Sequence, residues 1–260
     1  MKFYIYGKIG LLVFVIIFGF NIWLNSNVVV VEEEVFISDL PIEFEGFRIL
    51  QLSDLHGGWF GDSQEGLLGV VNGIECDLVV MTGDMGDRDF GESWDSVMAL
   101  VEGLKDKGTE VAYIEGNHGP FVVDEVSGGL TYEGDWLSEQ GVRLLRIEPI
   151  LVERSGKLLV VEEFSLRDES VRLDGVGDVR VGLSHYPMNE AFYEGRDLDY
   201  DLVLAGHFHG GQWRVPGFGA VFIPDIFGAG WFPDQDYVSG LVEYGGVQQY
   251  VSRGLGASGK

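Results

Sequence analysis

The chain has 260 residues, 46% of them apolar, so it can bury the core of one sizeable globular domain. Its 42 acidic and 17 basic residues give a formal net charge of −25. Such a surface repels phosphate backbones, so we expect no nucleic-acid-binding surface. The single cysteine excludes an internal disulfide and a cysteine-based metal site.

The first 27 residues differ from the rest of the chain. Lys2 and Lys8 precede an almost unbroken apolar run from Ile9 to Leu24, close to the roughly 20 residues that span a bilayer. We interpret 1–27 as an N-terminal transmembrane helix; a cleaved signal peptide is the alternative, although no small-residue cleavage site follows. The positive-inside rule places the N-terminus in the cytoplasm. This predicts a single-pass protein of the cell membrane with its main domain extracytoplasmic.

After this segment, short apolar runs alternate with helical stretches, which predicts an α/β fold. Residues 28–46 are expected to form a short acidic linker and a first strand, and 47–260 the main domain. Helical spacing is expected over 63–74 and over 93–108, with a glycine ending the second helix. Hairpin strands are expected around RSGK, and most of the remaining chain is strand-like.

Five of the strand-like runs end in polar residues that can bind a metal. These runs are FRILQLSDLH, CDLVVMTGD, TEVAYIEGNH, VRVGLSHYP and YDLVLAGHFH. All five histidines of the chain belong to this set, which comprises Asp54, His56, Asp84, Asn117, His118, His185, His207 and His209. In an α/β sheet, ligands collect at the carboxyl ends of the strands.

Each of these residues alone could be a loop or capping residue. That interpretation does not explain why all five histidines lie at the ends of strand-like runs. A mixed set of carboxylate, amide and imidazole ligands suits Mn²⁺, Fe or Zn²⁺ rather than Ca²⁺, which prefers oxygen ligands.

In this order, the five blocks resemble the motifs of the calcineurin-like metallophosphoesterases. GHFHGGQWRVPGFGA and YVSRGLG are similar to the membrane-associated bacterial branch of that family. The resemblance covers 47–256, with a poor match over 120–175. It implies two packed mixed β-sheets flanked by helices, a four-layer sandwich. It also implies phosphoester hydrolysis with two divalent ions, Mn, Fe or Zn, through attack of a hydroxide that bridges them.

The resemblance also implies a role for each residue. Six residues would bind one ion each: Asp54, His56 and His209 the first, and Asn117, His185 and His207 the second. Asp84 would bridge both ions. The catalytic residues would be Asn117 and His118, and His118 would contact the phosphate and protonate the leaving group.

The chain departs from the family pattern next to His118. Family members commonly carry an acidic residue directly after this histidine, where this chain has Gly119. Asp124, or another acid of the poorly matched segment 120–175, could take the place of that acid. Asp87, in GDMGDRD, lies where the family often has a second acid, and we expect it to support the centre rather than bind metal directly.

The sequence therefore predicts a membrane-anchored, metal-dependent phosphoesterase. Its substrate would be a phosphomonoester, a phosphodiester or a pyrophosphate, and a lipid-linked one would suit a site held near the bilayer. The alternative is a catalytically degenerate, metal-stabilised binding module of the same fold, which Gly119 favours and the complete ligand set does not. A membrane-tethered adhesion domain would leave the histidine placement unexplained.

Overall fold

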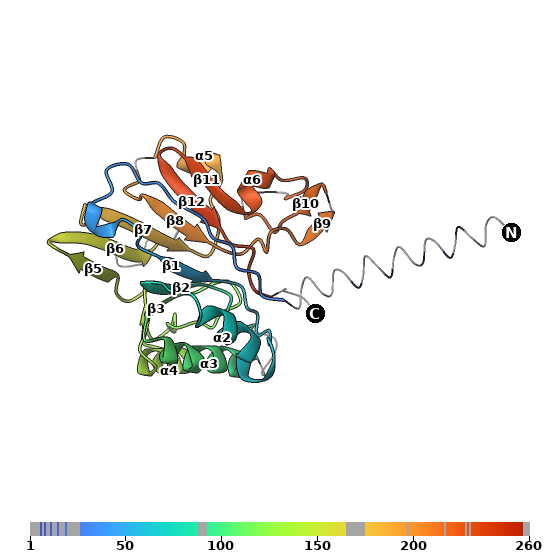
Figure 1. Ribbon diagram of the computed structural model, residues 1–260, viewed down its shortest axis with the longest axis horizontal. Helices are drawn as coiled ribbons and strands as arrows, with labels where there is room; N and C mark the ends of the chain where they lie inside the picture. Colours follow the sequence, from blue (N-terminus) through green and yellow to red (C-terminus); the bar gives the residue numbers. More distant parts are fainter. Residues whose placement is uncertain are drawn as a thin grey trace.

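Two β-sheets pack face to face in the computed structural model, and three helices cover the outer side of the smaller sheet (Figure 1). The structure describes residues 27–87, 93–164, 175–196, 198–215, 217–226, 228 and 230–256, together with Tyr6, Lys8, Leu11, Val15 and Gly19.

The smaller sheet consists of four parallel strands, in the order β1 (Ile49–Leu52), β2 (Leu78–Thr82), β3 (Glu110–Ile114) and β4 (Val142–Leu144). Its covering helices are α2 (Glu65–Val71), α3 (Ser93–Leu104) and α4 (Tyr132–Glu139). Short 3-10 turns precede α2 and follow α3, as η2 (Asp62–Gln64) and η3 (Lys105–Lys107). The chain leaves η3 through Gly108 at φ 67°, the left-handed stop expected from the sequence.

Strand β2 shows why the sheet is buried on both sides. Its five residues are all buried. Val79 and Met81 join the core under the helices, whereas Leu78 and Val80 join the core between the two sheets. Successive side chains of a strand point to opposite faces, so a continuous apolar run serves two cores at once.

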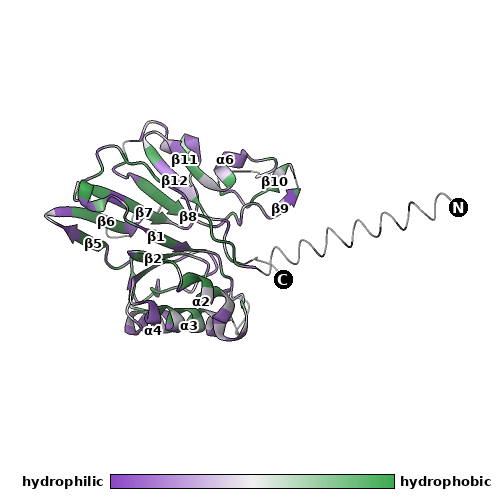
Figure 2. Ribbon diagram, in the orientation of Figure 1, coloured by the Kyte–Doolittle hydropathy of each residue, from purple (hydrophilic) through white to green (hydrophobic). Residues whose placement is uncertain are grey.

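The larger sheet has six strands and is mixed. Their order is β11 (Gly240–Tyr244), β12 (Val247–Val251), β8 (Leu202–Ala205), β7 (Val179–Ser184), β6 (Lys157–Glu163) and β5 (Ile150–Arg154). The two outer pairs are antiparallel, and the inner pairs are parallel. Figure 2 shows β8 as hydrophobic along its length, as expected for a central strand, and α4 as mostly hydrophilic.

Two small units complete the larger sheet. The short helix α5 (Glu190–Tyr193) contributes Phe192 and Tyr193 to a core on the outer face of the sheet. The hairpin of β9 (Trp213–Val215) and β10 (Gly219–Phe222) packs with α6 (Gln235–Val238) near the ends of β8 and β12.

The α/β class is confirmed, but two details of the expected fold are wrong. The smaller sheet is parallel rather than mixed, because each of β2, β3 and β4 follows a crossover that returns the chain in the direction of the strand before it. Residues 28–46 contain no strand; they run along the domain with one 3-10 turn, η1 (Ile42–Phe44), whose Phe44 is buried in the core between the sheets.

The prediction of a single-pass membrane protein is also corrected. In the part of the chain that the structure describes, no helix combines the length and the apolar character needed to cross a bilayer. Most of 1–27, on which that prediction was based, lies outside the described residues.

Candidate metal centre

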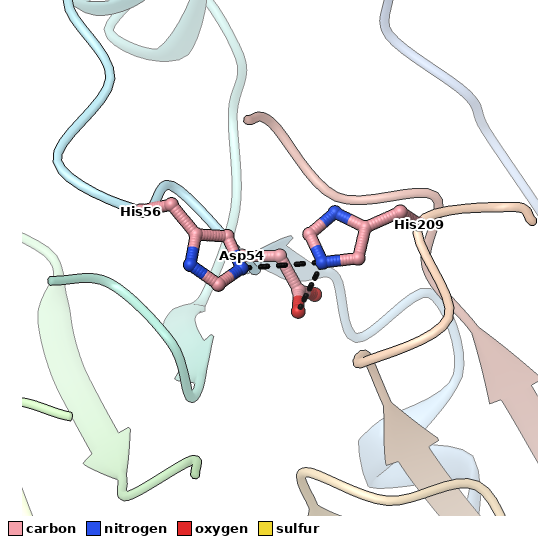
Figure 3. A group of neighbouring side chains, drawn as sticks. All are labelled: Asp54, His56 and His209. Atoms are coloured by element: carbon pink, nitrogen blue, oxygen red, sulfur yellow. Dashed lines mark hydrogen bonds and ion pairs between the residues drawn. The ribbon is translucent and has the colours of Figure 1, made fainter. Parts of the chain in front are cut away.

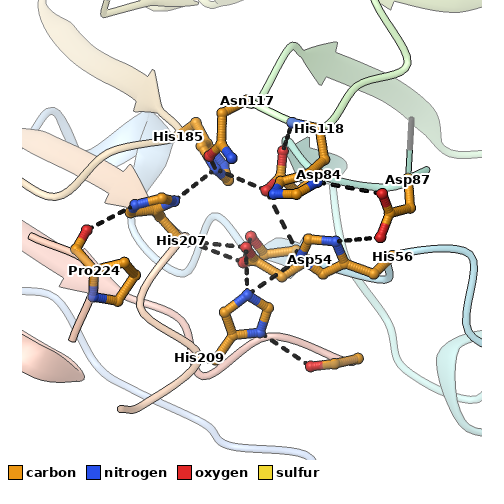
Figure 4. A network of polar contacts seen from close by, with 12 residues as sticks. Asp54, His56, Asp84, Asp87, Asn117, His118, His185, His207, His209 and Pro224 are labelled. Atoms are coloured by element: carbon orange, nitrogen blue, oxygen red, sulfur yellow. Dashed lines mark hydrogen bonds and ion pairs between the residues drawn. The ribbon is translucent and has the colours of Figure 1, made fainter. Parts of the chain in front are cut away.

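The carboxyl ends of five parallel strands from both sheets bring the candidate ligands together. Asp54 and His56 follow β1, Asp84 follows β2, and the pair Asn117 and His118 follows β3. From the larger sheet, His185 follows β7, and His207 and His209 follow β8. Figure 4 shows these side chains converging from loops of both sheets.

One cluster consists of Asp54, His56 and His209 (Figure 3). Nε2 of His56 lies 3.2 Å from Nε2 of His209, and Nε2 of His209 lies 3.6 Å from Oδ1 of Asp54. Asp54 is fully buried. A buried carboxylate facing two imidazole nitrogens is a set of donors that suits a divalent cation, since burial of such groups is unfavourable without a charge partner.

A second cluster consists of Asp84, His185 and His207, and Asn117 borders it. Nε2 of His185 lies 3.0 Å from Oδ1 of Asn117 and 3.1 Å from Nδ1 of His207. Oδ2 of Asp84 lies 3.2 Å from Nε2 of His185 and 3.7 Å from Nε2 of His56. A single oxygen of Asp84 therefore faces a histidine of each cluster.

Backbone carbonyls determine which nitrogen each histidine presents to its cluster. Nδ1 of His185 lies 3.0 Å from the carbonyl oxygen of Thr82. Nε2 of His207 and Nδ1 of His209 lie 3.0 Å from the carbonyl oxygens of Pro224 and Gly256. In a neutral ring, a nitrogen that bonds a carbonyl carries the proton, which leaves the other nitrogen with a free lone pair for a metal. In all three rings this other nitrogen faces a cluster.

The backbone is unusual at the candidate ligands. Five of them have φ between 48° and 70°, in the left-handed region: Asp54, His56, Asp84, His207 and His209. Such a conformation costs about 1–3 kcal/mol for a residue with a side chain, and residues that adopt it cluster at functional sites, although some, such as Ser155, adopt it elsewhere in this chain. The left-handed backbone at these five residues places their side chains toward the clusters.

Electrostatics keep two of the histidines neutral. Burial lowers the pKa of His56. Burial, and then the charge of His185, lower the pKa of His207 to about 3. Neutral imidazole is the form that binds metals, so both rings are available as ligands at neutral pH.

Asp84 and His185 form a coupled pair. Burial raises the pKa of Asp84, but the hydrogen bond and charge of His185 outweigh it and lower the pKa to about 2. Burial lowers the pKa of His185, and the hydrogen bond to Asp84 outweighs it and raises the pKa. The carboxylate of Asp84 is therefore ionised throughout the physiological range.

His118 stands beside the clusters, and Asp87 orients it. Nδ1 of His118 lies 3.3 Å from Oδ1 of Asp87, and its backbone N–H donates to Oδ1 of Asp84 at 2.7 Å. The other carboxylate oxygen of Asp87 lies 4.0 Å from Nδ1 of His56. The imidazole of His118 is about one third exposed, at 35%, so it can reach a molecule in solvent.

The contact between Asp87 and His118 resolves the departure noted at Gly119. Asp124 does not replace the missing acid, because its carboxylate accepts the backbone N–H groups of Val126 and Ser127 in an exposed turn. Gly119 itself has φ 97°, a conformation that strains any residue with a side chain. Asp87, which follows β2, thus supplies the carboxylate beside His118 that the family pattern places directly after this histidine.

Glycines allow the clusters to approach the backbone closely. A Cβ on Gly116 would overlap Oδ1 of Asp84, and one on Gly83 would lie 2.6 Å from Nδ1 of His185. We expect Gly116→Ala to displace the Asp84 carboxylate and to lower the free energy of unfolding by about 1–3 kcal/mol, the usual cost of overpacking. Denaturant unfolding measures this change.

The matched control for that variant is Gly69→Ala, in the exposed face of α2, where a Cβ would meet no atom within 4 Å. This change should raise the stability by about 0.5–1 kcal/mol. Equal effects of the two alanines would show that Gly116 does not limit the position of Asp84.

Sequence comparison identifies relatives of the chain. The family model described as calcineurin-like phosphoesterase matches residues 47–211, which include every candidate ligand. The uncharacterized metallophosphoesterase YkuE of Bacillus subtilis (strain 168) is 25% identical over 255 residues, covering 92% of this chain and 82% of that protein. The phosphodiesterase YaeI of Escherichia coli (strain K12) is 27% identical over 229 residues, covering 81% of this chain and 76% of that protein.

Among solved structures, the phosphopantetheinyl hydrolase PptH from Mycobacterium tuberculosis aligns with a TM-score of 0.46 and 12% identity, over 80% of this chain and 90% of that one. None of these matches distinguishes a membrane-associated branch.

Proposed function

Because the chain belongs to the calcineurin-like phosphoesterase family and is thus a metal-dependent phosphoester hydrolase, we propose that it hydrolyses phosphodiesters at a centre of two divalent ions. The observation that carries this proposal is Oδ2 of Asp84, which faces His56 in one cluster and His185 in the other. The relative named as a phosphodiesterase, at 27% identity, supports the choice of a diester over a monoester or a pyrophosphate.

The two clusters would hold one ion each. Asp54, His56 and His209 would hold the first, and Asn117, His185 and His207 the second, with Asp84 shared. The donors fit such ions: they mix oxygen and imidazole nitrogen, as Mn²⁺, Fe and Zn²⁺ accept. The backbone conformation of these residues, and the hydrogen bonds that orient three of the histidine rings, also suit a metal centre.

When bound, a pair of divalent ions supplies an activated water and neutralises charge on the phosphate oxygens. The chain would contribute orientation and a proton. Asp87 holds Nδ1 of His118, so that Nε2, which bonds no described residue, can carry a proton toward the leaving oxygen. The backbone N–H of His118 on Asp84 ties this acid to the shared ligand.

A catalytically degenerate binding module is the second candidate function. Its main support was the missing acid after His118. Since Asp87 supplies a carboxylate at 3.3 Å, that support is removed. A lipid-linked substrate was inferred from the membrane anchor, and no described helix could form such an anchor.

The purified protein tests the proposal directly. We expect it to contain two divalent ions per chain by elemental analysis and to hydrolyse bis(p-nitrophenyl) phosphate in the presence of Mn²⁺. Chelation should abolish the hydrolysis, and added metal should restore it. Full metal content without turnover of the diester or of p-nitrophenyl phosphate would favour the binding module instead.

A further inference from the structure

Two arginines meet at the edge of the candidate metal centre. Arg214 lies on β9 and Arg253 follows β12. A Cβ on Gly210, the residue after His209, would lie 2.9 Å from Nη1 of Arg214 and 3.0 Å from Cγ of Arg253. Nη1 of Arg214 also donates to the carbonyl oxygen of Gly210. The two side chains therefore share the space above the loop that carries His209.

The residues after Arg253 lie against the first cluster. A Cβ on Gly254 would be 2.8 Å from Cβ of Asp54. The carbonyl oxygen of Gly256 is the partner of Nδ1 of His209, at 3.0 Å. The arginine pair is thus joined to this cluster through Gly210 on one side and through Gly254 on the other.

Alternation along β9 directs Arg214 toward the loop. Its neighbour Trp213 packs on the opposite face of the hairpin, with ring centroids 5.5 Å from Trp231 and 6.3 Å from Phe222. Since successive side chains of a strand point to opposite faces, Arg214 lies on the Gly210 side. Its orientation is therefore a property of the hairpin.

The pair has no carboxylate partner among the described residues. Nε of Arg253 donates to Oγ of Ser239 at 3.4 Å, and Arg214 bonds a backbone carbonyl. In contrast, several arginines elsewhere pair with a carboxylate: Arg48, Arg143, Arg146, Arg154 and Arg180.

Carboxylates are plentiful in a chain with net charge −25, yet neither arginine of this pair contacts one among the described residues. Burial, and then the charge of Arg253, lower the pKa of Arg214, which shows that the two charges oppose each other. The guanidinium of Arg214 is partly buried against Gly210, while both arginines as whole residues remain exposed to solvent. An anion bound between them would relieve the repulsion and gain charge-assisted hydrogen bonds.

We propose that Arg214 and Arg253 form a subsite for a second phosphoryl group of the substrate, beside the ester that is cleaved. This inference rests on the proposed function and narrows its substrate class to phosphoesters that carry another phosphate. Guanidinium groups suit phosphate because they donate two parallel hydrogen bonds. They would also offset the general repulsion of a polyanion by an acidic protein.

A matched set of substrates tests the subsite. Each is a p-nitrophenyl phosphodiester of a straight-chain diol, and the far end of the diol carries either a phosphate or a hydroxyl group. Short, medium and long diols scan the unknown spacing. The readout is the ratio of kcat/KM for the phosphate form to kcat/KM for the hydroxyl form, because a general effect of a substitution cancels in this ratio.

We expect the wild-type ratio to reach about tenfold or more at one diol length, equivalent to about 1.4 kcal/mol. It should fall toward unity in Arg253→Gln and in Arg214→Gln/Arg253→Gln. Arg196→Gln, which removes an exposed arginine bonded to the carbonyl oxygen of Phe192, should keep the wild-type ratio. A ratio near unity at every length in the wild type, or an unchanged ratio in the arginine variants, overturns the subsite.

Calorimetric binding of the same esters separates this inference from the proposed function. If the metal-loaded protein cleaves none of the esters, the proposed function fails. The subsite is then supported if the protein binds the phosphate form more tightly than the hydroxyl form and if Arg253→Gln abolishes that preference. Equal binding of both forms, or an unchanged preference in Arg253→Gln, contradicts it. Metal content of each variant is measured alongside, since Arg214 contacts the loop of His209.

Discussion

Replacing Asp84 with alanine is expected to abolish metal-dependent phosphoester hydrolysis and to lower the metal content of both clusters. Its Oδ2 faces His185 at 3.2 Å and His56 at 3.7 Å, and it is the carboxylate oxygen among the described residues that lies near a histidine ring of each cluster. Elemental analysis and hydrolysis of bis(p-nitrophenyl) phosphate measure the two effects. The loss should be complete, because a centre that loses its shared ligand loses the spacing of its ions.

Two further variants show whether Asp84 is shared. His209→Ala removes a member of the first cluster and His207→Ala a member of the second, so each should weaken chiefly one ion. Asp84→Ala should weaken both. Equal and full metal content in all three variants would contradict the assignment of these residues as ligands.

Asp84→Asn separates the charge of this residue from its shape. Asparagine keeps an oxygen that can accept the backbone N–H of His118, a bond of 2.7 Å in the wild type. It lacks the charge that holds the pKa of His185 above its usual range. We therefore expect Asp84→Asn to lose metal as alanine does while the loop of His118 keeps its position. The pKa of His185 in the metal-free variant, followed by NMR, should fall, because burial, which lowers it, is then opposed by fewer groups, the charge of Asp54 and the hydrogen bond to Thr82.

The strand-end rule explains why the clustering of the candidate ligands could be predicted from the sequence. Asp54 and Asp84 each follow a run that reads as a buried strand, and such runs are recognisable locally. Parallel strands end at the same edge of a sheet, so residues far apart in the chain were expected to meet. The histidines after β7 and β8 follow the same rule from the larger sheet.

The partners of the ligands could not be predicted in the same way. Thr82, Pro224 and Gly256 orient histidines through backbone carbonyls, and a carbonyl leaves no signal in the side-chain pattern. The replacement of an acid beside His118 by Asp87 depends on two loops from different strands. Only its position in GDMGDRD pointed to a supporting role.

The fold shows a similar limit. Helical and strand periodicity predicted the alternating helices and strands, but an apolar run such as LVVMT does not indicate whether the neighbouring strands run parallel or antiparallel to it. The sequence of 28–46 contains apolar residues that suggest a strand, among them Val35 and Ile37. In the structure these residues pack against the core between the sheets without joining a ladder. The apolar pattern of these residues is explained by their packing against the core, and no strand is needed to account for it.

His118→Asn is expected to slow esters with poor leaving groups by about 10²–10⁴-fold, the range of a positioned proton donor. Esters of p-nitrophenol need little protonation, so they should be slowed less. Metal content should stay near that of the wild type, because the expected ligand is Asn117, which contacts His185 at 3.0 Å. Rates for a series of aryl and alkyl phosphodiesters measure the dependence on the leaving group.

Asp87→Asn tests how His118 is held. Its carboxylate lies 3.3 Å from Nδ1 of His118, and asparagine keeps the shape while removing the charge. We expect about a 10–100-fold loss, the usual effect of removing a group that orients a functional histidine. The loss should again be largest for poor leaving groups, and it should be small when His118→Asn is already present, since the two residues act as one unit.

The two variants together distinguish an acid from a group that only positions phosphate. If both variants slow all esters equally, His118 holds the phosphate and the leaving oxygen receives its proton from water. If Asp87→Asn instead loses metal, Asp87 is a ligand, as its place with His56 and His118 in a third cluster allows. A steeper dependence on the leaving group with full metal content is the result that an acid requires, because only proton transfer to the leaving oxygen makes the rate sensitive to the basicity of that oxygen.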